Sequence, residues 1–190
     1  MKRAIAALAF GLMSWSAFAG TVEKVSVYAT GAKSTTNWHG QADLEAIHFE
    51  LAREVSPRYD LAFVGAGMNV WQPRSWFGDT YHDGYETAHA VSASLLLRRR
   101  FRVDDRRSEL YVEVSSGPMW ADKRVPAATS RFNFISQLGA GLVLRPQARI
   151  PVILGYRLMH ISNGGYAPRN PGLNMMSVLV GARFRIATRR

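Results

Sequence analysis

The sequence predicts an all-β chain that forms an eight-stranded antiparallel transmembrane β-barrel of the outer-membrane type. Three observations favour this class. Eight segments are read as strands, and several alternate apolar and polar residues with a period of two. The connections between them alternate between long and short, which is typical of outer-membrane barrels. No segment after the amino terminus approaches the roughly 20 apolar residues of a membrane-spanning helix.

The amino terminus has the features of an export leader. Lys2 and Arg3 form a basic start, residues 4–13 are apolar, and Ala17-Phe18-Ala19 fits the small-x-small cleavage pattern. The apolar run is too short to span a bilayer as a helix. We therefore expect a signal peptide over residues 1–19 and a single barrel domain over residues 20–190.

The composition narrows the class of partner. The chain has no cysteine, which excludes disulfides and thiolate metal sites. Its net charge is +10 and falls to +8 when Lys2 and Arg3 leave with the leader, and no Asp or Glu follows Asp122. Such a basic half suits nucleic acid, anionic lipid headgroups or a phosphorylated glycolipid. Export argues against nucleic acid.

The eight expected strands are separated in places by only a few residues. They are expected over residues 22–31, 42–54, 59–70, 86–98, 109–117, 132–144, 150–163 and 173–186. In a barrel that crosses a membrane, apolar side chains point outward and polar or small ones inward. The outward set includes Leu110, Val112 and Val114 in the fifth strand, Leu138 and Ala140 in the sixth, and Met176, Val178 and Val180 in the eighth. The faces of the third and fourth strands are ambiguous.

The lengths of the connections predict how the barrel is oriented in the membrane. The long ones, rich in Gly, Pro, Asn, Ser and aromatic residues, cover 31–41, 71–85, 118–131 and 164–172. Those at 55–58 and 145–149 are short, and 99–108 is intermediate and charged. Long loops face the cell exterior and short turns the periplasm. An even number of strands leaves both termini in the periplasm, so the seventh strand runs outward.

The alternative fold is a soluble periplasmic barrel or lipocalin-like sandwich with its apolar face inward. It would place Glu113, Arg157, Arg183 and Arg185 on the solvent side. The continuation of the chain beyond Phe184 favours it, because outer-membrane strands commonly end on an aromatic residue.

The seventh strand carries the chemistry. His160 and Ser162 are two residues apart near its outer end, so they share one face. The rest of that face is apolar: Leu154, Tyr156 and Leu158. A serine made nucleophilic by an adjacent imidazole is the arrangement that hydrolyses acyl esters. A polar pair on a lipid-facing surface suggests that the substrate is itself a lipid.

Further groups could complete such a site. Asn174, on the outward face of the eighth strand, would return beside His160 through the hairpin of residues 164–172. Candidate oxyanion or substrate-orienting groups are Asn163, Gly164, Gly165 and Asn170. Asn-Pro-Gly is also a common turn signal, and a His-x-Ser pair is frequent by chance. His39, His48, His82 and His89 lack regular ligand spacing, so no metal or other cofactor is expected.

His160-Ile161-Ser162-Asn163-Gly164-Gly165 and Asn170-Pro171-Gly172-Leu173-Asn174 resemble the lipid A 3-O-deacylase (PagL-type) family of Gram-negative outer membranes. The resemblance implies that His160 is the base, Ser162 the nucleophile, and Asn163 and Asn170 polar groups close to the site. The implied reaction is hydrolysis of the ester-linked acyl chain at the 3-position of lipid A, without a metal, on the barrel exterior.

One position departs from the family pattern. A characterised member carries Glu where this chain has Asn174, so an orienting carboxylate would have to come from elsewhere, for example Asp79, Asp83 or Glu86. The expected partner is lipopolysaccharide in the outer leaflet of the outer membrane, and a homodimer is one arrangement compatible with such a barrel. The competing function is a non-catalytic barrel that binds outer-leaflet glycolipid or has a structural role.

Overall fold

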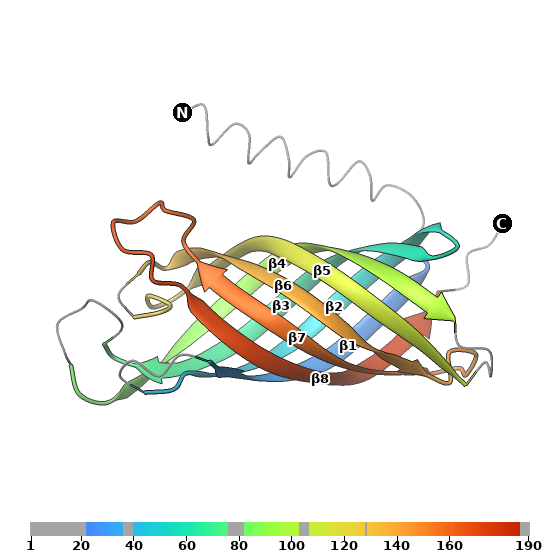
Figure 1. The fold of residues 1–190 in the computed structure, drawn as a ribbon, viewed down its shortest axis with the longest axis horizontal. Helices are drawn as coiled ribbons and strands as arrows, with labels where there is room; N and C mark the ends of the chain where they lie inside the picture. Colours follow the sequence, from blue (N-terminus) through green and yellow to red (C-terminus); the bar gives the residue numbers. More distant parts are fainter. Residues whose placement is uncertain (1–21, 36–39, 76–81, 103–106, 128, 187–190) are drawn as a thin grey trace, which may run out of the picture.

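Eight antiparallel strands close into one barrel in the computed structural model, in which each strand pairs with its sequence neighbours and β8 pairs with β1 (Figure 1). The structure describes residues 22–35, 40–75, 82–102, 107–127 and 129–186. The strands are β1 Lys24–Ser34, β2 Asp43–Ser56, β3 Tyr59–Pro73, β4 Tyr85–Arg102, β5 Ser108–Ala121, β6 Phe132–Leu144, β7 Val152–Ser162 and β8 Leu173–Arg185. The leader expected over residues 1–19 lies outside the described residues.

All eight predicted strands are present, and the eight-stranded antiparallel barrel is confirmed. The largest differences are at strand ends. β4 continues to Arg102 and β5 to Ala121, beyond the expected 98 and 117. Pro118 is the first residue of the long connection that the sequence predicts over 118–131. It stays within β5, where the ladder to β4 is interrupted between the Ser92 and Leu95 pairs while that to β6 continues.

The two ends of the barrel differ. The connections β1–β2, β3–β4, β5–β6 and β7–β8 lie at one end, called here the loop end. The shorter connections β2–β3, β4–β5 and β6–β7 lie at the opposite end, the turn end, together with the start of β1 and the end of β8 (Figure 1). This is the alternation that the sequence predicts.

The apolar side chains face outward along the strands. Val178 is 63% exposed and Leu138 is 59% exposed, whereas Arg157 is 2% and Glu113 is 4% exposed. A soluble barrel with an apolar pocket requires the reverse. The lipocalin-like alternative is therefore wrong for this chain, and the barrel has the inside-out arrangement of outer-membrane proteins.

Buried charges in the middle of the barrel are paired with one another. The Arg98 guanidinium donates to both Glu50 oxygens at 2.7 and 2.8 Å and to Glu113 Oε2 at 2.9 Å. Arg157 donates to Glu113 Oε1 at 2.6 Å and to the Tyr28 hydroxyl at 3.1 Å. Pairing of this kind is what permits ionised groups inside a barrel.

Towards the loop end the interior is an apolar core instead. Its larger members are Leu44, Met68, Val70, Met119, Ile135, Met159, Ile161, Leu173 and Met175. Met159 and Ile161 alternate along β7 with the outward His160 and Ser162. The strands that carry the candidate site are therefore held from inside by close packing.

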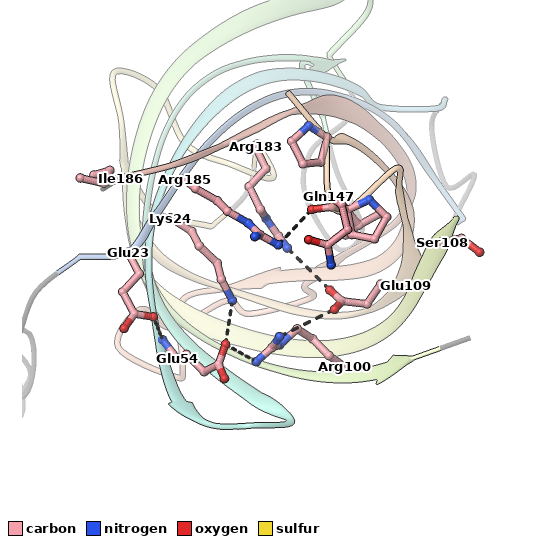
Figure 2. A pocket seen from close by; sticks show the side chains of 13 residues that line it. Glu23, Lys24, Glu54, Arg100, Ser108, Glu109, Gln147, Arg183, Arg185 and Ile186 are labelled. Carbon is pink, nitrogen blue, oxygen red and sulfur yellow. Dashed lines mark hydrogen bonds and ion pairs between the residues drawn. The ribbon is translucent and has the colours of Figure 1, made fainter. Parts of the chain in front are cut away.

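The turn end opens into a charged cavity of about 790 Å³. Figure 2 shows the charged side chains of Lys24, Glu54, Arg100, Glu109 and Arg183 pointing toward one another. Lys24 and Arg100 reach Glu54 at 3.5 and 2.8 Å, and Arg183 lies 3.8 Å from Glu109. No helix within the described ranges is long and apolar enough to cross a membrane.

Candidate active site

The candidate catalytic side chains lie on the outer surface at the loop end of β7. Exposed and buried positions alternate along this strand, and His160 is exposed in continuation of Leu154, Tyr156 and Leu158. Ser162, the last residue of β7, is half-buried on the same face. The period of two that predicts a shared face for His160 and Ser162 thus persists to the end of the strand.

The imidazole of His160 is held by Asn174. The two residues are a cross-strand pair of β7 and β8, and His160 Nδ1 lies 2.6 Å from Asn174 Oδ1. An amide oxygen only accepts, so Nδ1 carries a proton, and in the neutral imidazole Nε2 keeps its lone pair. This is the tautomer that a general base requires.

Gly172 leaves the room that the imidazole occupies. A Cβ atom at this position would come 2.8 Å from His160 Cε1, and the φ of Gly172 is +70°, where a side chain is strained. The last pair of β7 and β8 is Ile161–Leu173, and Gly172 directly precedes it in the chain. The imidazole therefore leans toward β8.

The loop after Ser162 begins with a tight turn. Tyr166 N–H donates to Asn163 O at 3.2 Å, and the intervening Gly164 and Gly165 have φ of +63° and +81°. Positive φ at both central positions defines a type I′ turn and accounts for the glycine pair.

Asn163 organises this loop rather than facing outward. It is buried, its amide donates to Arg169 O at 2.7 Å, and its Oδ1 accepts from Gly165 N–H at 2.9 Å. Its own N–H donates to Asn170 Oδ1 at 3.0 Å. The expectation that Asn163 and Gly165 supply oxyanion donors needs correction, because these groups already bond within the loop. Gly164 and Asn170 are exposed and remain candidates.

An aromatic cluster lies on the β6 side of the site, and the sequence analysis did not identify it. Phe134, the cross-strand partner of Ser162, has its ring 6.1 Å from that of Tyr166 and 5.4 Å from that of Phe132. The alternation along β6 predicts only that Phe132 and Phe134 share one face of the strand. Tyr166 is far from them in sequence, so only the fold brings the three together.

Two of the acidic alternatives to Asn174 lie in and just before β4. Glu86, on β4, is engaged by Gln72 at 3.4 Å and by Lys123 at 3.4 Å. Asp83 accepts a hydrogen bond from Gly84 N–H at the same end of β4. Asp79 lies outside the described residues. Among the described side chains, Asn174 is the one seen on His160 Nδ1.

A second imidazole–amide pair provides an internal comparison. His89 Nδ1 lies 2.8 Å from Asn69 Oδ1 across β3 and β4, again on the exposed face. Thr87 precedes His89 by two residues toward the loop end, but its cross-strand partner is Trp71, whose ring stacks on Tyr85 at 3.9 Å. No glycine there corresponds to Gly172. Within the described part of the chain, no cluster of three or more His, Asp or Glu side chains could hold a metal.

The comparison with protein families decides the relationship. A family model described as "Lipid A 3-O-deacylase (PagL)" matches residues 52–183, more than half of the chain and including His160, Ser162 and Asn174. The chain belongs to the PagL family.

Individual relatives of the PagL family are more distant. The chain is 37% identical over 71 residues to the lipid A deacylase PagL of Bordetella bronchiseptica, and this match covers 37% of the chain and 36% of that relative. The matched segment thus spans about a third of the relative's length.

Two solved structures share the barrel. The crystal structure of the outer membrane enzyme PagL is 19% identical with a TM-score of 0.55, covering 86% of this chain and 99% of that one. Neisserial surface protein A is 13% identical with a TM-score of 0.60, covering 87% and 98%. Because an enzyme and a protein named only for its surface location share this fold, the barrel itself does not decide activity.

Proposed function

We propose that this PagL-family barrel is an outer-membrane hydrolase that removes the ester-linked acyl chain at the 3-position of lipid A. The observation that carries the proposal is the His160–Asn174 hydrogen bond, on an apolar outer surface and beside Ser162. An imidazole that is held in place with Nε2 free to accept a proton can act as the general base for a neighbouring serine. On a surface that contacts lipid, a water-soluble substrate would not reach it.

In the proposed mechanism His160 Nε2 takes the proton of Ser162 Oγ as that oxygen attacks the ester carbonyl carbon. The tetrahedral intermediate collapses, the ester C–O bond breaks, and the leaving sugar oxygen receives the proton from His160. Water then attacks the acyl-serine with His160 again acting as base, releasing a fatty acid and restoring Ser162. Asn174 Oδ1 accepts a hydrogen bond from Nδ1–H throughout and keeps the ring in place.

The negative charge that develops on the carbonyl oxygen needs donors. We assign this role to Gly164 N–H and the Asn170 amide, both in the exposed loop that follows Ser162. Asn163 and Gly165 support it by fixing the turn through their mutual hydrogen bond.

The surroundings fit an anionic lipid substrate. The apolar exterior of β6–β8 would contact acyl chains, and exposed cations lie beyond the strands at the loop end. Arg124 and Arg131 in the β5–β6 connection are exposed, and Arg matches phosphate oxygens in a bidentate manner. Loop-end cations therefore suit the phosphates of lipid A.

Two further expectations belong to this proposal. Residues 1–19 act as a signal peptide, and residues 20–190 form the mature domain in the outer membrane. A homodimer stays a prediction, which size measurements on the detergent-solubilised protein would check.

Mass spectrometry of lipid A from membranes that contain the protein tests the function. His160→Ala and Ser162→Ala should abolish loss of the 3-position acyl chain while the barrel stays folded. His89→Ala and Thr87→Ala are matched controls, because they alter a similar imidazole and hydroxyl on the same outer surface. Retained deacylation in either first variant would overturn the mechanism. Intact lipid A with the native protein would favour a non-catalytic glycolipid-binding barrel.

A further inference from the structure

Two serine hydroxyls form a pair on the outer surface of β5 and β6. Ser116 Oγ lies 2.9 Å from Ser136 Oγ, and the two residues are cross-strand partners. Ser136 is in turn the cross-strand partner of His160, which is the partner of Asn174. The serine pair therefore continues the polar row of the candidate site across two further strands.

The row descends from the rim of the barrel. Asn174 is the second residue of β8, His160 is two residues from the end of β7, Ser136 is four residues into β6, and Ser116 is five residues from the end of β5. The strands in Figure 1 are tilted relative to the barrel axis, so a row of cross-strand partners runs obliquely away from the loop end. Ser116 and Ser136 lie farther from the loop end than the candidate catalytic residues.

The serine pair is surrounded by apolar side chains on this face. Val114 and Leu138, the next outward residues toward the turn end of β5 and β6, are 52% and 59% exposed, and Leu158 on β7 is 47% exposed. Two hydroxyls carry two hydrogens, and their mutual bond uses one. In a hydrocarbon environment a hydroxyl hydrogen without a partner is costly. A ligand with an oxygen atom at this depth would complete the bonding.

The imidazole occupies the β8 side of the site and leaves the β6 side, where the serine pair lies, for the acyl chain of the substrate. The His160 ring lies against Gly172, toward the β8 side of β7. The β6 side carries Phe134 opposite Ser162 and, two residues deeper, Ser136. An acyl chain that leaves the ester carbonyl away from His160 passes over Phe134 and then the serine pair.

We infer that the Ser116–Ser136 pair is a specificity-determining subsite that hydrogen-bonds an oxygen atom carried by the substrate's acyl chain. Strands spaced about 4.8 Å apart with about 3.4 Å per residue put Ser136 roughly 8 Å from Ser162 along the surface. The two serine side chains cover part of this distance, and the remainder corresponds to a few methylene groups of the acyl chain. The oxygen therefore lies within the first few carbons of the chain, and the enzyme selects oxygen-substituted acyl esters over plain ones. This inference rests on the proposed function.

The test uses two synthetic esters of equal chain length and the same sugar alcohol, one with a hydroxyl on the third acyl carbon and one without. The full-length protein in lipid vesicles should have a kcat/KM roughly three- to tenfold higher for the hydroxylated ester, the range expected of one neutral hydrogen bond. Ser116→Ala/Ser136→Ala should bring the ratio of the two kcat/KM values close to one. The kcat/KM for the plain ester should fall by less than the kcat/KM for the hydroxylated ester, because the plain ester has no oxygen for the pair to bind.

Two variants separate this role from a structural one. Ser136→Thr keeps the hydroxyl and should keep the preference, and Ser108→Ala removes a hydroxyl from the opposite end of β5 and should not alter it. A preference that survives in the double variant, or equal rates for both esters with the native protein, overturns the inference while the proposed function stands. If the native protein hydrolyses neither ester nor lipid A, the proposed function fails and the inference falls with it.

Discussion

His160 Nδ1 and Asn174 Oδ1 lie 2.6 Å apart across the second pair of β7 and β8 from the loop end, so an uncharged amide occupies the place where a carboxylate would orient the imidazole. The amide fixes the tautomer as a carboxylate would. It cannot stabilise by charge the imidazolium that forms when Ser162 loses its proton. This difference leads to the first prediction.

Asn174→Ala should lower kcat for lipid A deacylation by roughly 10²-fold, less than the ~10⁴-fold loss seen when a buried triad carboxylate is replaced. Asn174→Glu should keep or raise activity, because its carboxylate would also stabilise the imidazolium. Asn69→Ala alters the other imidazole–amide pair and serves as the control. Unchanged turnover in Asn174→Ala, with loss of activity in Asp83→Ala, would move the orienting role to the β3–β4 connection.

Gly172→Ala should reduce activity at least about tenfold, since small displacements of a catalytic group have large effects on rate. The added Cβ would lie 2.8 Å from His160 Cε1 and would displace the ring from its place beside Ser162. Deacylation by the refolded variant, compared with its heat-modifiable mobility on gels, checks this. Gly31→Ala is the matched control, because a Cβ there meets nothing within 4 Å. Full activity in Gly172→Ala would show that the ring does not need this space.

The outward and inward assignments can be checked with spin labels in lipid vesicles. Labels at Leu154, Leu158 and Val178 should be accessible to lipid-soluble oxygen, because these side chains are exposed on the apolar surface. Labels at Arg157 and Arg183 should be protected, because those positions are buried within the barrel. Oxygen contact at the arginine positions and protection at the others would contradict the inside-out barrel.

Arg98→Met should lower the free energy of unfolding by about 3–5 kcal/mol, because it leaves the buried Glu50 carboxylate without its main partner and Glu113 with Arg157 alone. Urea unfolding in lipid vesicles measures the change. Arg99→Met provides the control, since Arg99 is the adjacent residue on the exposed face. A loss for Arg98→Met no larger than for Arg99→Met would show that the central network contributes little.

Much of this architecture could be predicted because β-strands repeat every two residues. Alternation in β5, β6 and β8 predicts their outward faces, and the register places Asn174 beside His160. The apolar core beneath the site could not be predicted in the same way. Ile135 and Met159 point inward next to outward apolar residues, so both faces of those stretches are apolar and periodicity does not separate them.

The loop after Ser162 is the other part that sequence reasoning missed. Gly165 is expected from the sequence to donate to an oxyanion, whereas its N–H donates to Asn163 Oδ1 and it forms a type I′ turn with Gly164. The turn depends on the hydrogen bonds of Asn163, which form only when the loop is folded. The Ser116–Ser136 pair likewise depends on the register between two strands.

The most direct test of the central claim is to find which residue attacks the substrate. The native protein, treated in lipid vesicles with a phosphonate analogue of an acyl ester and digested, should show by peptide mass spectrometry a covalent adduct on Ser162. His160→Ala should fail to form it, and His89→Ala should form it normally. An adduct on another residue such as Ser136, or an unmodified Ser162 in a protein that still deacylates lipid A, would contradict this account.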